Sequence, residues 1–353
     1  MKAMYFIDGK IAKTCKDLND VVKVKVADVS PIHYAKGNYK SIQEARNPSI
    51  VWQPYRQGME WAKRDDHAWF KFQVQVPKEL EGKSLSLYVT SYRQGWDATN
   101  PQFIIYINGR LTQGVDVNHT RIILTHRAMS GEIFYVDVHG YSGMISGQTA
   151  FLPELFEVHE DIMKLYYDIK VPLEITSFMD DNDKSKHDML TALNQACNII
   201  DFRKPGSSLF YDSVAQADSY IQTELYEKMK DRSDVVATCV GHTHIDVAWL
   251  WTVEQTREKT ARSFSTVLRL MEEYPEYIFM SSQPQLYKFL KEDYPEVYER
   301  VKEKIAEGRW EAEGGMWLEA DCNVTSGESL VRQILYGKIF FKNEFGVDNK
   351  IVW

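Results

Sequence analysis

The spacing of the hydrophobic residues changes along this 353-residue chain, and the changes constrain its fold more than any other feature. Between about residues 52 and 138 apolar residues alternate with polar ones, as in Phe70-Lys71-Phe72-Gln73-Val74. A period of two is typical of strands that bury one face. Further strands are expected at residues 85–89, 103–107 and 133–138. The dipeptide Asn108-Gly109 predicts a type I′ hairpin turn, and residues 1–153 therefore predict an all-β sandwich that resembles a jelly roll.

The period becomes 3.6 in the next part of the chain. One face of an amphipathic helix would carry Met189, Leu190, Leu193, Cys197 and Ile200. This pattern predicts a helical connector over residues 154–232.

Strands and helices alternate over residues 233–353. The continuous apolar run at 235–240 predicts a strand buried on both faces. Further strands are expected at 278–280, 309–313 and 351–353. Helices between them would begin at two capping boxes, Thr252 with Gln255 and Thr325 with Glu328, and the last would end near Gly346. Alternation of this kind predicts a parallel α/β fold, here the first half of a (β/α)7–8 barrel, because a complete barrel needs about 250 residues. We therefore expect a multidomain chain that is truncated.

Composition excludes several classes of partner. The chain carries 50 acidic and 42 basic residues, a formal charge of -8, and no long run of Lys or Arg, so nucleic acid is not expected. It has neither an 18-residue apolar run nor a signal peptide, so no membrane partner is expected. The cysteines form no CxxC pair, which favours a reducing, cytoplasmic location. They are Cys15, Cys197, Cys239 and Cys322.

The first chemical motif, GHTHIDVAW, directly follows the predicted strand that ends at Val240. Active sites of parallel α/β folds gather at the carboxyl ends of strands. Residues two apart share a face of an extended segment, so His242, His244 and Asp246 could point into one cavity and bind zinc. The alternative is a set of hydrogen-bonded polar residues at a strand end.

The second motif, EGGMWLEADCN, follows the strand expected at 309–313. Its paired glycines let backbone approach a ligand closely, and Trp317 offers a flat apolar face. Glu319 and Asp321 could lie on one side of an extended segment. The alternative is an acidic, solvated loop.

The segments HTHIDVAWLW and GGMWLEADCNVTSGESLVRQ together resemble glycoside hydrolase family 38, the retaining α-mannosidases, and in particular the N-terminal portion of its intracellular and bacterial branch. The resemblance implies that His244 and Asp246 are zinc ligands and that Asp321 is both a zinc ligand and the catalytic nucleophile. Trp249 would form the aromatic wall against the mannose ring, with a core tryptophan as the alternative. His242 would lie behind the ligands without binding the metal.

The implied function is a zinc-dependent retaining α-mannosidase that hydrolyses terminal α-mannosyl linkages of oligosaccharides through a covalent glycosyl-enzyme on Asp321. The resemblance implies one bound divalent ion, with metals other than zinc as alternatives. Assembly into a homo-oligomer is a further possibility. In the family pattern a histidine ligand and the acid/base aspartate follow further along the chain than Trp353. We therefore expect this chain alone to bind zinc weakly and to be inactive.

Other classes of protein remain open on the residues alone. A metal-dependent amidohydrolase or phosphoesterase would use His242 and His244 as joint ligands and would not need Asp246. A carbohydrate-binding module would use exposed aromatic residues of the sandwich, although alternating aromatics in strands favour a structural domain. If the truncation is natural, the chain could instead be a pseudoenzyme.

Overall fold

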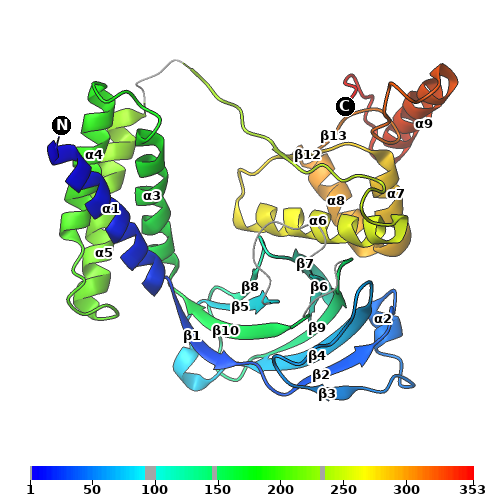
Figure 1. Ribbon diagram of the computed structural model, residues 1–353, viewed down its shortest axis with the longest axis horizontal. Helices are drawn as coiled ribbons and strands as arrows, with labels where there is room; N and C mark the ends of the chain where they lie inside the picture. The colour runs from blue at the N-terminus through cyan, green and yellow to red at the C-terminus, as the bar shows by residue number, and fades with distance from the viewer. Residues whose placement is uncertain (1, 92–100, 145–148, 231–234) are drawn as a thin grey trace.

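The computed structural model describes residues 2–91, 101–144, 149–230 and 235–353 (Figure 1). The sequence-based boundary between residues 232 and 233 lies outside the described residues. The described parts form a β-sandwich, a helical bundle, and a mixed region of helices and parallel strands that rests on the sandwich.

Two antiparallel sheets make the sandwich, which confirms the expected β fold. In spatial order, the six-stranded sheet contains β3 (Gln53–Tyr55), β2 (Ile32–Lys36), β4 (His67–Gln75), β9 (Ile133–Tyr141), β6 (Gln102–Ile107) and β7 (Arg110–Val115). The four-stranded sheet contains β1 (Lys23–Asp28), β10 (Leu152–Val158), β5 (Leu85–Thr90) and β8 (Arg121–Thr125). Two short helical pieces accompany them, α2 (Ile42–Ala45) and the 3-10 turn η1 (Lys78–Leu80).

Strand β4 shows why these residues form a sandwich. Phe72 and Val74 are buried between the sheets while Gln73 is exposed, as the alternation predicts. At the start of the strand Trp69 is buried as well, because helices cover the outer face of the sheet there. The predicted hairpin is also confirmed, since Asn108 and Gly109 join β6 to β7 with φ of 52° and 83°, the left-handed values of a type I′ turn.

The bundle contains more of the chain than the sequence suggests. It contains α1 (Lys2–Val21), α3 (Glu160–Thr176), α4 (Lys184–Ile199), α5 (Ser208–Ile221) and the π-helical turn η2 (Gln222–Glu227). The helix α1 packs against α3 and α4, although its residues precede the sandwich in the chain. The predicted face of α4 is buried in the shared core.

The last region combines three short parallel strands with four helices. These are β11 (Gly241–His242), α6 (Val253–Glu273), β12 (Phe279–Ser281), α7 (Pro284–Asp293), α8 (Pro295–Ala306), β13 (Trp310–Ala312) and α9 (Gly327–Phe345). The strand order is β11-β12-β13. Alternating strands and helices are confirmed, but the described residues form a three-stranded sheet and no barrel.

Two predicted strands of this region are wrong. Residues 235–240 are exposed and irregular, with Val235 and Val236 more than four-fifths exposed. An apolar run becomes a buried strand only where neighbouring layers cover both of its faces, and none of the described helices or strands buries this segment. Residues 351–353 are likewise irregular and exposed, although the Ile351 carbonyl accepts a hydrogen bond from the Gly315 amide (2.9 Å).

Helix ends follow the sequence closely. Thr252 caps α6 by accepting a hydrogen bond from the amide of Gln255, as predicted. The cap of α9 is Ser326 instead of Thr325, because the hydroxyl of Ser326 accepts from the amide of Ser329. That helix ends at Gly346, whose φ of 73° is the left-handed conformation typical of a helix end.

Helix α6 joins the two regions by packing along the outer face of the six-stranded sheet (Figure 1). The contact with β7 is very close at Gly114, where a Cβ atom would lie 2.7 Å from Cβ of Arg262. The Gly114 amide also donates a hydrogen bond to Oγ1 of Thr266 (3.1 Å). No helix among the described residues is both long and apolar enough to cross a membrane.

Candidate active site

The first motif begins on β11 and continues into the loop that leads to α6. The Gly241 amide donates to the carbonyl of Ile278 (2.8 Å), which places β11 beside β12. A Cβ at Gly241 would lie 2.1 Å from Oη of Tyr277, so any larger residue there would require the Tyr277 side chain to move. His244, Asp246 and Trp249 therefore follow the carboxyl end of a parallel strand, but this strand is Gly241–His242 within the motif and not the run predicted at 235–240.

His244 stands between two carboxylates. Its Nε2 lies 3.1 Å from Oδ1 of Asp246, and its Nδ1 lies 2.5 Å from Oε2 of Glu319. The side chains of His244 and Asp246 are about half exposed, whereas that of Glu319 is 16% exposed. The two motifs thus meet at this histidine, through Glu319 of the second motif.

Two buried residues hold Glu319 in this position. The hydroxyl of Ser282 donates to Oε1 of Glu319 (2.6 Å), and Nε2 of Gln283 donates to the same oxygen (3.1 Å). Gln283 also donates to the carbonyl of Ile245 (2.9 Å), and its φ of 61° is unusual for a residue with a side chain. Sequence reasoning missed both residues; the signal that could have found them is a polar Ser-Ser-Gln run at the end of a buried strand.

Asp321 lies apart from this cluster. Its Oδ1 accepts a hydrogen bond from the amide of Asn323 (2.8 Å), and its carbonyl accepts from the amide of Thr325 (3.0 Å). In the described part of the chain no hydrogen bond or ion pair joins Asp321 to His244 or Asp246. Asp321 is exposed two residues beyond Glu319, in the loop before α9.

Trp249 is 56% exposed, so the alternative of a core tryptophan is wrong. Its ring meets that of Trp251 edge to face at 5.2 Å. Trp251 in turn donates from Nε1 to the carbonyl of Asp246 (3.0 Å), and Nζ of Lys259 lies 4.5 Å from its ring centre. Burial, together with the charge of Arg262, lowers the pKa of Lys259 to about 8.

His242 has a different environment from His244. Its ring lies 4.7 Å from that of Trp353, and its Nε2 is buried without a hydrogen-bond partner. Burial lowers the pKa of His242, and the neighbouring charge of Glu319 raises it by a smaller amount. Among the described residues His244 thus contacts Asp246 and Glu319, and no hydrogen bond or ion pair joins it to His242.

Over residues 2–91, 101–144, 149–230 and 235–353, potential metal-ligand atoms of three or more His, Cys, Asp or Glu side chains lie within 4.8 Å of one another in a single group. It consists of His67, His139 and Glu258, none of which the sequence indicated. The predicted ligands His244, Asp246 and Asp321 do not form such a group.

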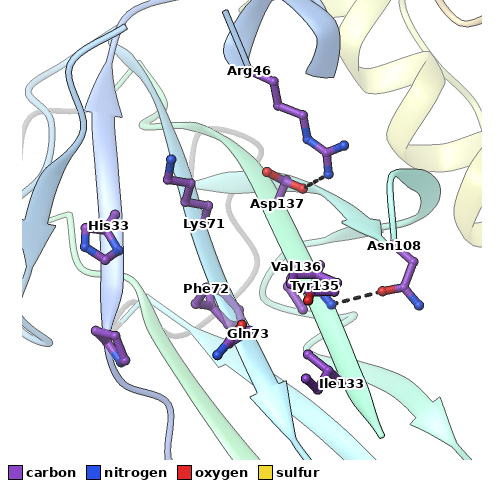
Figure 2. A pocket seen from close by; sticks show the side chains of 11 residues that line it. His33, Arg46, Lys71, Phe72, Gln73, Asn108, Ile133, Tyr135, Val136 and Asp137 are labelled. Carbon is purple, nitrogen blue, oxygen red and sulfur yellow. Dashed lines mark hydrogen bonds and ion pairs between the residues drawn. The ribbon is translucent and has the colours of Figure 1, made fainter. Parts of the chain in front are cut away.

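The sandwich has a cavity of about 840 Å³ on its six-stranded sheet (Figure 2). Lys71 and Gln73 point into it from β4, and Tyr135, which is 53% exposed, points into it from β9. An ion pair between Arg46 and Asp137 (2.6 Å) closes one side. Exposed polar and aromatic side chains of this kind keep open the alternative of a carbohydrate-binding module.

Known protein families match two separate parts of the chain. The N-terminal domain of glycosyl hydrolases family 38 matches residues 234–353, and the jelly roll domain of alpha-mannosidases matches residues 21–167.

Curated relatives show the same similarity. Alpha-mannosidase G of Dictyostelium discoideum is 31% identical over 356 residues, covering 93% of this chain and 30% of its own length. Alpha-mannosidase 2C1 of Homo sapiens is 31% identical, covering 79% of this chain and 27% of its own length. The alpha-mannosidase of Saccharomyces cerevisiae is 29% identical, with 81% and 28% covered. The chain thus spans less than a third of the length of these relatives.

Proposed function

Because residues 234–353 match the N-terminal domain of glycosyl hydrolases family 38, we propose that this chain forms part of a zinc-dependent retaining α-mannosidase site. The substrates would be oligosaccharides with terminal α-mannosyl linkages. The observation that carries the proposal is the meeting of His244, Asp246 and Glu319 beyond the ends of parallel strands. We also propose a cytoplasmic location, and this rests on the cysteine pattern alone.

The contacts of His244 suit a metal ligand. A neutral imidazole has one N–H, and if Nδ1 carries it toward Glu319, the lone pair of Nε2 faces Oδ1 of Asp246 at 3.1 Å. Two acceptors at this distance repel each other unless a cation or proton lies between them. Two ligands of tetrahedral zinc stand roughly 3.4 Å apart, given bonds of about 2.0–2.2 Å. The pair could therefore share one zinc ion.

Glu319 would orient the histidine ligand. Metal-binding imidazoles commonly donate their second N–H to a carboxylate, which fixes the ring and its tautomer. Ser282 and Gln283 already satisfy the other oxygen of Glu319, so its carboxylate cannot rotate freely. This arrangement is more specific than a solvated acidic loop, which was the alternative for the second motif.

Asp321 would act as the nucleophile. In a retaining mechanism its carboxylate attacks the anomeric carbon, the bond to the leaving oxygen breaks, and a general acid protonates that oxygen. Water then cleaves the glycosyl ester and restores the carboxylate. A bound zinc ion would supply positive charge to hold sugar hydroxyls. Trp249 would pack its exposed ring against the apolar face of the mannose.

The test is hydrolysis of an aryl α-mannoside by a longer polypeptide that contains this chain, because we expect this chain alone to be inactive. Asp321→Asn should lower turnover at least about 10³-fold, since it removes the nucleophile. Asp161→Asn, an exposed aspartate in the first turn of α3, is the matched control and should have no effect. Full activity of Asp321→Asn, or hydrolysis of the β-mannoside alone, would refute the proposal.

A further inference from the structure

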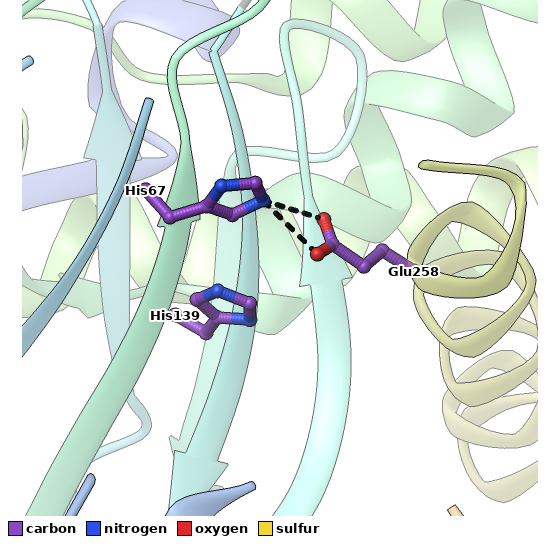
Figure 3. Close-up of side chains that lie close together, drawn as sticks. All are labelled: His67, His139 and Glu258. Carbon is purple, nitrogen blue, oxygen red and sulfur yellow. Dashed lines mark hydrogen bonds and ion pairs between the residues drawn. The ribbon is translucent and has the colours of Figure 1, made fainter. Parts of the chain in front are cut away.

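His67, His139 and Glu258 meet where the sandwich contacts α6 (Figure 3). His67 comes from β4 and His139 from the neighbouring β9, and their rings lie 5.3 Å apart in a stacked arrangement. Glu258 reaches them from α6, with its two oxygens 3.0 and 3.3 Å from Nε2 of His67. One potential ligand atom from each residue lies within 4.8 Å of the other two.

The three side chains are almost completely shielded from solvent. His139 is 3% exposed and Glu258 5% exposed. Nevertheless Nε2 of His139 has no hydrogen-bond partner, which is unfavourable for a buried polar group. Trp69 stacks on the ring of His139 at 4.9 Å and 9°, which holds the imidazole in place. The ring of His139 is therefore held in a fixed position with its Nε2 atom unpaired.

Burial affects the pKa values of both buried groups. It lowers the pKa of His139 to about 4. It raises the pKa of Glu258, but the hydrogen bond from His67 and nearby positive charges lower that pKa by more, to about 2.

An acidic cavity of about 580 Å³ leads to this group. His139 and Glu258 both line it, together with four further carboxylates, Glu44, Glu254, Glu292 and Asp293. Only two basic side chains, Lys40 and Arg257, line the same cavity. An excess of negative charge around an opening concentrates cations there. The cavity therefore provides both an entry path and space for a further ligand.

From this geometry we propose that His67, His139 and Glu258 form a divalent metal site that ties the sandwich to α6, separate from the site at His244. Two imidazoles and one carboxylate are ligands that zinc accepts in a four-coordinate site, with water from the cavity as the fourth. The ion would satisfy the unpartnered Nε2 of His139 and replace the direct contact of His67 with Glu258.

Arg262 limits the affinity of this site. Its Nη1 lies 3.8 Å from Oε2 of Glu258, so a dication would share that carboxylate with a guanidinium. Arg262 also donates a hydrogen bond to Oε1 of Gln102, which holds it in place. Removing the positive charge with Arg262→Gln should therefore tighten zinc binding by about tenfold or more, an effect not expected of a metal-free hydrogen-bonded cluster.

The experiment measures zinc bound to the purified chain by equilibrium dialysis and elemental analysis, and thermal unfolding with zinc or with chelator. Asp246→Ala serves as the background, because it removes a ligand of the other proposed site. In that background we expect one zinc ion per chain and a higher Tm with zinc. His139→Phe keeps the stacking on Trp69 but removes the ligand, and should abolish both effects.

His187→Ala, an exposed histidine on α4, is the matched control and should leave zinc binding unchanged. In chelator His139→Phe should be at least as stable as the parent, because it removes an unpartnered buried nitrogen. The proposal fails if His139→Phe binds as much zinc as the parent. It also fails if the parent neither retains bound zinc nor shows a higher Tm with zinc than with chelator. No tightening in Arg262→Gln would also count against it.

Discussion

Nδ1 of His244 lies 2.5 Å from Oε2 of Glu319, so a side chain of the second motif positions the central histidine of the first. The two residues are 75 positions apart in the sequence, and β11 and β13 bring their loops together on either side of β12.

Glu319→Gln should weaken zinc binding at His244 by about 10- to 100-fold, the usual effect of removing the carboxylate behind a histidine ligand. The amide keeps the size of the side chain but can no longer accept a proton from His244 with a full negative charge. Competition with a chromophoric chelator measures the affinity. Glu328→Gln on the exposed first turn of α9 is the control, and equal affinities in the two variants would contradict the prediction.

Asp246→Ala should lower zinc binding much more than His242→Ala does. Asp246 faces Nε2 of His244, whereas His242 packs on Trp353. Zinc content is compared in a His139→Phe background, so that only this site contributes. An amidohydrolase site would give the reverse order, with His242 essential and Asp246 dispensable.

Gly114→Ala should destabilise the chain by about 1–3 kcal/mol, the usual cost of overpacking. The added methyl group would lie 2.9 Å from the backbone of Arg262, which cannot move aside as a flexible side chain could. Urea unfolding measures the free energy. Gly9→Ala, in helix α1 with open space around its Cβ, should instead be neutral or stabilising by up to about 1 kcal/mol. Equal effects at both positions would be inconsistent with the close contact.

Lys259→Met should be more stable than the parent chain at pH 7, and the difference should shrink as the pH rises from about 8 toward 10.5. The pKa of Lys259 is lowered by burial to about 8, so the unfolded chain binds more protons than the folded chain in that range. The stability of the parent chain therefore rises with pH there. Chemical unfolding at several pH values tests this, and a constant difference would contradict it.

Tyr135→Ala and Gln73→Ala should leave the affinity for methyl α-mannoside unchanged, because we expect the cavity on the sandwich to be structural. Both side chains are exposed, so their loss should change the free energy of unfolding by no more than about 0.5 kcal/mol. Calorimetric titration of the chain measures binding. A clear loss of affinity in either variant would instead support a carbohydrate-binding module.

Patterns that depend on one local rule were predictable from the sequence. Alternation places Phe72 and Val74 inside the sandwich, and Asn108-Gly109 adopts the expected turn, because both effects act within a few residues. The apolar run at 235–240 shows the limit of such rules. Hydrophobicity indicates that a segment could be buried, but only its neighbours in space decide whether it is.

The part of the candidate site that depends on residues close together in the sequence was also predictable. His244 and Asp246 are two residues apart, so their proximity follows from the chain itself. His67 and Glu258 are 191 residues apart, and no spacing rule links a strand of the sandwich to a helix of another region. Ser282 and Gln283 likewise gain meaning only when β12 places them beside Glu319.

The close contact of Gly114 with Arg262 has a consequence for how the molecule unfolds. A helix seated on a sheet at this distance can neither slide nor rotate without breaking the packing around Trp69 and Phe264. The sandwich and the parallel-strand region should therefore lose their structure in one cooperative transition. The bundle has its own core and should give a separate heat-absorption peak in calorimetry.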